Sequence, residues 1–368
     1  MPDRNACLVD NGRPTASCDR VSTEDLSLKA LLLPFQAGNL PWPPGRILFL
    51  RARDGWPLRQ MDLSGLRAEQ GFRPLADALQ RGGVDVAAEL PADEPPAPLV
   101  LVLPPRQRDE ARALLARAVA LAGPGGRVVA AASNDEGARS REKDLQQLAG
   151  LAGNLTKFHC RVFWTPPLQG PADPELAARW AMADAVRPMA GGRFHSRPGV
   201  FAWDRIDAAS ALLAAHLPAD LRGRGADLGA GWGYLASEVL ERAPGVTALD
   251  LYEAEFRALE LARRNLADAR LAPGFHWHDV TAGLPRDGYD FMVSNPPFHA
   301  HDRGDRPELG QRFIEVAAQA LRPGGRLLLV ANRHLPYEGT LAQVFPALRV
   351  LAEAGGFKVI EATKGASR

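Results

Sequence analysis

The chain has 368 residues, of which 46% are hydrophobic and 24% are charged, and its formal net charge at pH 7 is +1. This length is sufficient for two domains, each with its own core. The near-neutral charge excludes a globally basic nucleic-acid-binding protein, although a local basic patch remains compatible with it.

The cysteines and the N-terminus favour a reducing compartment. Cys7, Cys18 and Cys160 are widely spaced and form no Cys-x-x-Cys pair, which indicates reduced thiols, with neither a disulfide framework nor a metal site. The polar first 20 residues lack the apolar core of a signal peptide. No apolar run approaches the roughly 20 residues that span a bilayer. We therefore expect a cytoplasmic protein that does not enter a membrane.

The first block of the chain, residues 1–165, alternates strand and helix patterns. Its early strand, "RILFLRARDG" at 46–55, runs into no glycine-rich loop. Residues 98–134 then give an apolar strand, Pro104-Pro105, a helix, a Pro-Gly-Gly-Arg turn and a second strand. This alternation predicts a parallel sheet.

A linker follows the first block. Residues 166–192 are rich in Pro, Ala and Gly and carry one predicted short helix near 174–186. The remaining residues, 193–368, are expected to form a second domain.

The second block shows strand and helix patterns more clearly than the first. Residues 223–243 and 246–266 each give a strand, a turn and an amphipathic helix, and 289–298 give a strand that stops at two prolines. A helix, a Pro-Gly-Gly break and a strand follow at 310–332. These elements predict a doubly wound, mostly parallel sheet, and we expect the tail at 357–364 to be its closing edge strand.

The two blocks share their order of parts, which indicates an internal duplication. Pro104-Pro105 matches Pro296-Pro297, and Pro-Gly-Gly-Arg recurs at 124–127 and 323–326. The second copy is longer by about seven residues, around "HAHDRGD". Leu103 stands where the second copy has Asn295, and Arg106 stands where it has Phe298. The first block is therefore predicted to have kept a fold and lost a site.

A glycine loop, "DLGAGWG", follows the first strand of the second block. Gly229, Gly231 and Gly233 permit a tight turn and close approach of a ligand to the backbone. The third glycine falls one residue too early for a dinucleotide fingerprint, and the Gly-Lys-Ser/Thr of a P-loop is absent. An ordinary tight turn without a ligand is the alternative interpretation.

Carboxylates near this loop suggest the ligand. Asp250 lies 21 residues after Gly229, at the predicted end of the next strand, which suits a partner for ribose hydroxyls, with Glu253 as the fallback. Asp279, beside Val280, follows a further strand and could accept a hydrogen bond from an adenine amino group. Asp227 is expected to organise the loop and the methionine moiety. Adenosine contacts without a pyrophosphate fingerprint indicate S-adenosylmethionine.

The stretch "SNPPFH" follows the fourth strand and suits methyl transfer to a poor nitrogen nucleophile. Such a nitrogen needs positioning, and acceptors for its N–H groups as it becomes tetrahedral. The Asn295 side-chain oxygen and the Pro296 carbonyl are the predicted acceptors, held by the rigid prolines. Phe298 offers a stacking surface for a planar target. His299 either assists proton removal or forms part of the pocket wall.

Together, "DLGAGWG", "SNPPFH" and "VANRHLPY" resemble the motifs of bacterial ribosomal RNA guanine-N2 methyltransferases. The resemblance covers roughly residues 190–365 and implies two tandem Rossmann-like class I methyltransferase domains, the N-terminal one degenerate. It implies S-adenosylmethionine as cofactor and a guanine N2 amine of ribosomal RNA as target, with small-subunit 16S RNA favoured over large-subunit 23S RNA. Ribosomal RNA or a ribosomal subunit is the implied partner of a monomeric, metal-free enzyme.

The resemblance also assigns residues. It implies Asn295, Pro296 and Phe298 at the target amine, and Gly229, Gly231, Asp250 and Asp279 around the cofactor. A Phe-Ser element and an Asp before the glycine loop enclose the cofactor in the family. This chain supplies Phe201, Asp207 and Ser210, but Ala202 replaces the expected Ser.

Several cations are candidates for RNA phosphate contacts: Arg139, Arg141, Lys143, Arg303, Arg306, Arg333 and His334. Two other functions remain open. One is an Asn-Pro-Pro methyltransferase acting on a DNA adenine or a protein glutamine, against which Phe298 counts mildly because those relatives more often have Tyr there. The other is a non-catalytic RNA-binding relative.

Overall fold

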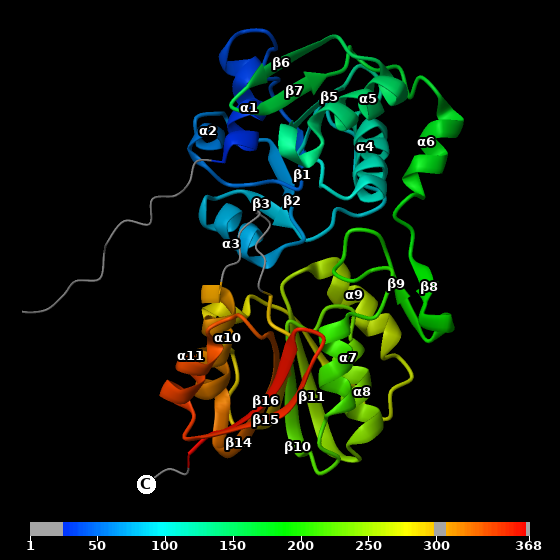
Figure 1. Ribbon diagram of the computed structural model, residues 1–368. Coiled ribbons are helices and arrows are strands. Elements are labelled where there is room, and N and C mark those ends of the chain that lie inside the picture. The colour runs from blue at the N-terminus through cyan, green and yellow to red at the C-terminus, as the bar shows by residue number, and fades with distance from the viewer. Residues whose placement is uncertain (1–24, 298–306, 366–368) are drawn as a thin grey trace, which may run out of the picture.

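The computed structural model describes residues 25–297 and 307–365. These residues include two seven-stranded sheets, one above the other in Figure 1, joined along one side by the segment that carries helix α6. Parallel pairing joins the first five strands of each sheet in chain order, and antiparallel pairing attaches the last two. This confirms the predicted α/β class with two tandem, mostly parallel sheets.

The N-terminal sheet follows helix α1 (Leu26–Gln36). Its strands are β1 (Ile47–Leu50), β2 (Leu66–Glu69), β3 (Asp85–Ala87), β4 (Leu99–Val102), β5 (Arg127–Ser133), β6 (Gly153–Lys157) and β7 (Cys160–Trp164). The intervening helices are α2 (Trp56–Arg59), α3 (Arg73–Arg81), α4 (Arg108–Ala122), η1 (Asn134–Glu136) and α5 (Ala138–Ala149).

The predicted linker carries α6 (Pro174–Ala181), which ends earlier than expected, and β8 (Arg187–Met189). A short turn, η2 (Ala190–Gly192), leads to β9 (Phe194–Ser196), which pairs with β8. This small hairpin crosses the predicted boundary at 192.

The C-terminal sheet follows helix α7 (Ala208–Ala215). Its strands are β10 (Arg222–Leu228), β11 (Gly245–Glu253), β12 (Gly274–Trp277), β13 (Tyr289–Ser294), β14 (Leu321–Asn332), β15 (Ala347–Ala354) and β16 (Phe357–Thr363). The remaining helices are α8 (Tyr234–Arg242), α9 (Phe256–Asn265), η3 (Val280–Ala282), α10 (Pro307–Ala320) and α11 (Tyr337–Val344).

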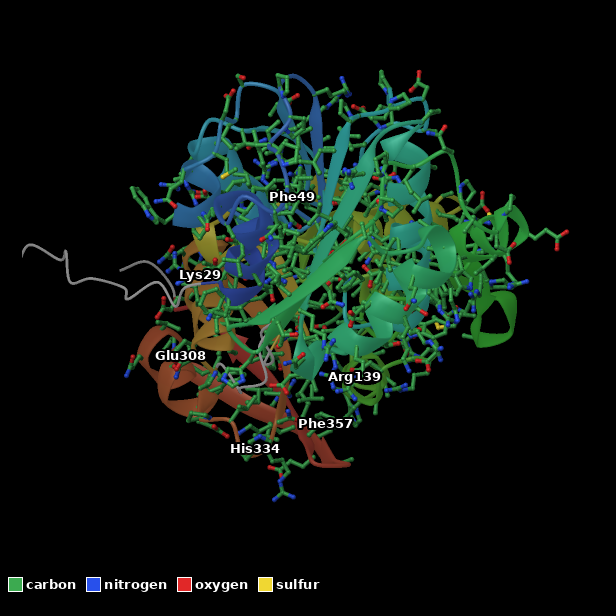
Figure 2. The ribbon with its side chains drawn as sticks, turned by 90° about the horizontal axis from the view of Figure 1, so that it is seen from above. Lys29, Phe49, Arg139, Glu308, His334 and Phe357 are labelled. Atoms are coloured by element: carbon green, nitrogen blue, oxygen red, sulfur yellow. The ribbon has the colours of Figure 1, made fainter. Side chains whose placement is uncertain are left out.

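The central strands are buried on both faces. In β1, Leu48 and Leu50 join a cluster with α4 and α5, whereas Ile47 and Phe49 join a second cluster with α1. Side chains of a strand alternate between faces, and helices cover both faces of a doubly wound sheet. All four residues are therefore buried, including Phe49, which Figure 2 labels in the N-terminal half.

The two sheets have the same strand order, β3-β2-β1-β4-β5-β7-β6 and β12-β11-β10-β13-β14-β16-β15. Their registers also match. Leu50 pairs with Val102 as Leu228 pairs with Ser294, so Leu103 occupies the place of Asn295. The predicted alignment of the repeat is thus confirmed at the fourth strand. By the same register, Phe49 occupies the place of Asp227, and Arg51 that of Gly229.

One predicted strand position is wrong. The tail strand β16 lies inside the sheet, between β14 and β15, and β15 forms the edge. The residues of β15 are exposed or half-buried, and five of its eight residues are Ala or Leu. Such a segment gives no strand pattern, because these residues favour helices and an edge strand buries little.

The two halves meet through a pair of reciprocal hydrogen bonds. The Arg73 N–H donates to the Ala254 carbonyl (2.8 Å), and the Phe256 N–H donates to the Gly71 carbonyl (2.9 Å). Helices α3 and α9 begin at Arg73 and Phe256, so the same position of each copy makes the same contact. Such pairing is isologous, as in a two-fold dimer. It joins the sheets at the carboxyl ends of β2 and β11.

Arg257 completes this interface. Its guanidinium contacts Glu110 of the N-terminal half (2.7 Å), Asp184 after α6 (3.7 Å) and Glu255 (3.1 Å). These residues line a cavity of about 540 Å³ between the halves, which does not include the glycine loop. The interface is therefore held by buried charge as well as by backbone pairing.

Candidate active site

The glycine loop joins β10 to α8 in an unusual backbone conformation. Gly229, Gly231 and Gly233 have φ of 73°, 54° and 90°, in the left-handed region that other residues rarely adopt. A Cβ on Gly231 would meet nothing within 4 Å, whereas one on Gly233 would lie 3.2 Å from Ala262 of α9. The backbone at Gly231 is therefore open to a ligand. The absence of a side chain at Gly233 lets the start of α8 pack closely against α9.

Glu253, the last residue of β11, holds this loop. The Gly231 N–H donates to its Oε2 (2.7 Å), and the Glu255 N–H donates to its Oε1 (2.8 Å). Burial raises the pKa of Glu253. The carboxylate retains acceptor capacity beyond these two bonds, since each oxygen has two lone pairs.

Asp250 was predicted to end this strand, and that is wrong. It lies three residues before the end of β11, and its carboxylate accepts a hydrogen bond from the hydroxyl of Tyr289, the first residue of β13 (2.8 Å). His276 Nε2 lies 3.1 Å from the other oxygen. Asp250 therefore belongs to a buried network inside the sheet. Glu253 is the residue of β11 that lies at the carboxyl edge of the sheet.

Asp227 lies in β10 directly before the loop and is fully buried. Neither of its carboxylate oxygens has a hydrogen-bond partner within the described part of the chain. Burial, with a smaller contribution from the nearby charge of Glu253, raises the pKa of Asp227 to about 8, although the backbone N–H of Ala236 acts in the opposite direction. A buried carboxylate without partners is costly, which makes this group a candidate for contact with a cation or a donor.

Asn295 follows β13 directly and lies half-buried at the same edge. Its Nδ2 donates to Asp207 Oδ2 and to Ser210 Oγ, both at 2.9 Å. The preceding Ser294 donates its hydroxyl to the Leu228 carbonyl (2.8 Å), which ties β13 to the end of β10. Pro296 is buried, and Phe298 and His299 lie outside the described residues.

A small cavity of about 50 Å³ brings these elements together. It is lined by Phe201, Ala202, Asp207, Ser210, Gly229, Ala230, Gly231, Trp232, Tyr234, Leu235 and Asn295. Trp232 is buried and donates its indole N–H to the Phe201 carbonyl (3.2 Å). Phe201 is 63% exposed and lines the cavity, so an aromatic residue lies next to the predicted amine acceptors.

The sequence patterns assigned no role to four of these residues, Ala230, Trp232, Tyr234 and Leu235. Trp232 lies between two glycines of the loop, and Tyr234 follows the last of them. The hydrophobic pattern gives no signal for either, but an aromatic residue among loop glycines is unusual enough to indicate a packing role.

Asp279 and Val280 lie near the carboxyl end of β12, outside this cavity. Asp279 caps η3 by accepting hydrogen bonds from the Thr281 N–H (2.8 Å) and hydroxyl (2.7 Å). The Val280 side chain is buried in the core beside α10. Cofactor contacts of both residues stay predictions.

The predicted RNA-contacting cations are in different situations. Arg139, labelled in Figure 2, and Lys143 are exposed. Arg141 is buried and donates to the carbonyls of Pro105 and Arg106, so its predicted exposure to RNA phosphate is wrong. Arg333 pairs with Glu353 (3.4 Å). Arg303 and Arg306 lie in the undescribed segment 298–306.

Residues 25–297 and 307–365 contain neither a membrane-spanning helix nor a metal-ligand cluster. Among these residues, no helix is long and apolar enough to cross a membrane. The same residues include no group of three His, Cys, Asp or Glu side chains placed to hold a metal ion.

Comparison with known proteins gives consistent results. The methyltransferase small domain family matches residues 191–361. Ribosomal RNA small subunit methyltransferase C of Pseudomonas paraeruginosa is 33% identical over 72% of this chain and 78% of its own length. The enzyme of the same name from Haemophilus influenzae strain PittGG is 30% identical over 72% and 78%.

A solved structure matches nearly the whole chain. The T. thermophilus 16S rRNA N2 G1207 methyltransferase (RsmC), in complex with AdoMet and guanosine, superposes with a TM-score of 0.76 at 25% identity. The match covers 93% of this chain and 92% of that one, so both sheets are included. The chain therefore belongs to the ribosomal RNA small subunit methyltransferase C family of S-adenosylmethionine-dependent methyltransferases.

Proposed function

We propose that the protein transfers a methyl group from S-adenosylmethionine to the exocyclic N2 amine of a guanine in small-subunit ribosomal RNA. The observation that carries this proposal is the Asn295 amide beside the glycine loop. Both of its N–H groups are used by Asp207 and Ser210, so its oxygen is the atom that remains to accept from a substrate amine.

Residues at the strand ends fit the cofactor. The unpartnered carboxylate of Asp227 suits the ammonium of a methionine moiety, and Glu253 at the end of β11 suits ribose hydroxyls. The open backbone at Gly231 allows close approach. When bound, S-adenosylmethionine supplies an electrophilic methyl group on a positively charged sulfur.

Asn295 and Pro296 prepare the amine for attack. A guanine N2 lone pair is delocalised into the ring, so the amine must be turned and its N–H groups satisfied as the nitrogen becomes tetrahedral. The Asn295 oxygen and the Pro296 carbonyl would accept those two N–H groups, which stabilises the positive charge that develops on nitrogen. After methyl transfer, the extra proton on the nitrogen would pass to solvent water. A guanine base would have to turn out of its stack to enter this pocket.

The substrate follows from the relatives. RsmC of T. thermophilus is described with guanosine bound, and the curated relatives are named for the small subunit. These names favour 16S RNA over 23S RNA, a DNA adenine or a protein glutamine. We place the reaction in the cytoplasm, with ribosomal RNA or a ribosomal subunit as partner and a monomeric enzyme.

We also propose that residues 1–165 serve RNA recognition, with 166–192 as linker and 193–368 as catalytic domain. Phe49 and Arg51 replace Asp227 and Gly229 in the N-terminal half, and Leu103 replaces Asn295. These replacements remove a cofactor site and leave the fold intact. Exposed Arg139 and Lys143 in the same half suit phosphate contacts.

Asn295→Ala tests the proposal directly. We expect methyl transfer to small-subunit RNA to fall by about 1,000-fold or more, because the amine loses its oriented acceptor. Binding of S-adenosylmethionine, measured by calorimetric titration, should stay within about twofold of wild type. Turnover at the wild-type rate would contradict the assignment.

Glu253→Gln should weaken the cofactor. Replacing the carboxylate loses a charged acceptor for hydroxyls, at a cost of about 1–3 kcal/mol, or roughly 5- to 150-fold in Kd. Asp250→Asn is the control, since it alters a buried network away from the loop and should lower the urea midpoint with little change in Kd. If Asp250→Asn raised Kd and Glu253→Gln did not, the two roles would be exchanged.

Asp227 should make the stability of the cofactor-free protein depend on pH. Its pKa is raised in the folded state, from 3.8 to about 8, so the folded protein binds a proton that the unfolded chain releases. The free energy of unfolding should therefore fall as pH rises from about 4 to about 8, by at most about 1.4 kcal/mol per pH unit.

Asp227→Asn should remove this dependence. Urea denaturation of both proteins at several pH values measures it as the difference between wild type and variant. Parallel stability curves across this range would show that Asp227 keeps an ordinary pKa in the folded protein.

A further inference from the structure

The orientation of the Asn295 amide decides whether it can act. A half-turn of the amide plane exchanges its oxygen, which only accepts, with its nitrogen, which only donates. A substrate amine donates its N–H groups as hydrogen bonds, so it needs the amide oxygen as acceptor. Something in the protein must therefore hold the nitrogen end away from the substrate.

The neighbours of Nδ2 perform this selection. Asp207 Oδ2 and Ser210 Oγ each lie 2.9 Å from the nitrogen. An ionised carboxylate accepts hydrogen bonds and donates none, so it pairs with the nitrogen and repels the oxygen. Ser210 alone would not discriminate, because a hydroxyl both donates and accepts.

Asp207 is itself fixed by the helix that it begins. It is the N-cap of α7, and its Oδ2 accepts the Ser210 N–H (2.9 Å). The same oxygen thus caps the helix and receives the Asn295 amide. A capping carboxylate is held in a narrow geometry and lies where the helix dipole favours negative charge.

The degenerate half provides a natural comparison. Helix α1 precedes β1 as α7 precedes β10, and Asp25 is its N-cap. There the second carboxylate oxygen pairs with Arg53 (2.9 Å), and Leu103 stands in place of Asn295. The cap persists in both halves, but only in the catalytic half does the capping aspartate hold an amide.

We propose that Asp207 is a positioning residue for methyl transfer, which fixes the Asn295 amide with its oxygen toward the target amine. This role rests on the proposed function. Besides selecting the orientation, the negative carboxylate polarises the amide toward its oxygen and strengthens the acceptor as charge develops on the amine.

Asp207→Gly is the main test. Glycine is an adequate N-cap that costs only a few tenths of a kcal/mol, so the helix should persist while the selecting acceptor is lost. We expect kcat on small-subunit RNA to fall about 10- to 100-fold, with KM for RNA and Kd for S-adenosylmethionine within about twofold of wild type. Thermal unfolding should show an almost unchanged midpoint.

Two matched variants separate positioning from general damage. Asp25→Gly makes the same change at the corresponding cap of the degenerate half and should leave kcat unchanged. Asp207→Asn keeps an acceptor oxygen at the cap without the charge, so it should recover part of the rate that Asp207→Gly loses. If Asp207→Gly proves unstable, Asp207→Ser, which keeps a capping oxygen but lacks the carboxylate, should still lower kcat.

The outcomes distinguish the two claims. Wild-type kcat in Asp207→Gly, or no recovery in Asp207→Asn, would overturn the positioning role while wild-type methylation of RNA stands. Failure of the wild-type protein to methylate small-subunit RNA would instead overturn the proposed function.

Discussion

The site depends on one constraint, the register in which three parallel strands end together. Leu228 pairs with Tyr252 on one side and with Ser294 on the other, and the Ser294 hydroxyl binds the Leu228 carbonyl. This alignment brings the glycine loop, Glu253 and Asn295 together at the carboxyl edge of the sheet. A shift by a single residue would turn every side chain of a strand to the opposite face. Ligands of open α/β sheets bind at the carboxyl ends of the strands, where the residues that follow neighbouring strands come together.

The duplication shows which features belong to the fold and which to the chemistry. Left-handed backbone after the first strand persists in both halves, at Arg51 (φ 54°) and at Gly229 (φ 73°). The Pro-Pro pair after the fourth strand persists as well, at Pro104 and Pro296. What differs is the set of polar groups at the edge. The reciprocal backbone contact beyond the carboxyl ends of β2 and β11 then brings the two halves together.

Sequence patterns predicted the strands and helices near the site well, because glycines, prolines and apolar runs mark each strand end locally. Asn295 and the repeat register could be found this way. That Glu253 and not Asp250 ends β11 could not be found this way, since β11 extends three residues further than its apolar pattern suggests. Asp207 and Ser210 came from the family resemblance. Their contact with Asn295 spans more than 80 residues of sequence, and only the folded chain reveals it. Arg141 is buried and donates hydrogen bonds to backbone carbonyls. The pattern of charged residues in the sequence gives no sign of this burial.

The identity of the methylated product would test the proposed activity most directly. Purified protein would be incubated with unmodified 16S and 23S RNA and with both ribosomal subunits, using labelled S-adenosylmethionine, and the RNA digested to nucleosides. We expect label in N2-methylguanosine from small-subunit RNA, at a single position. Label in methyladenosine, in 23S RNA alone or in protein would contradict it.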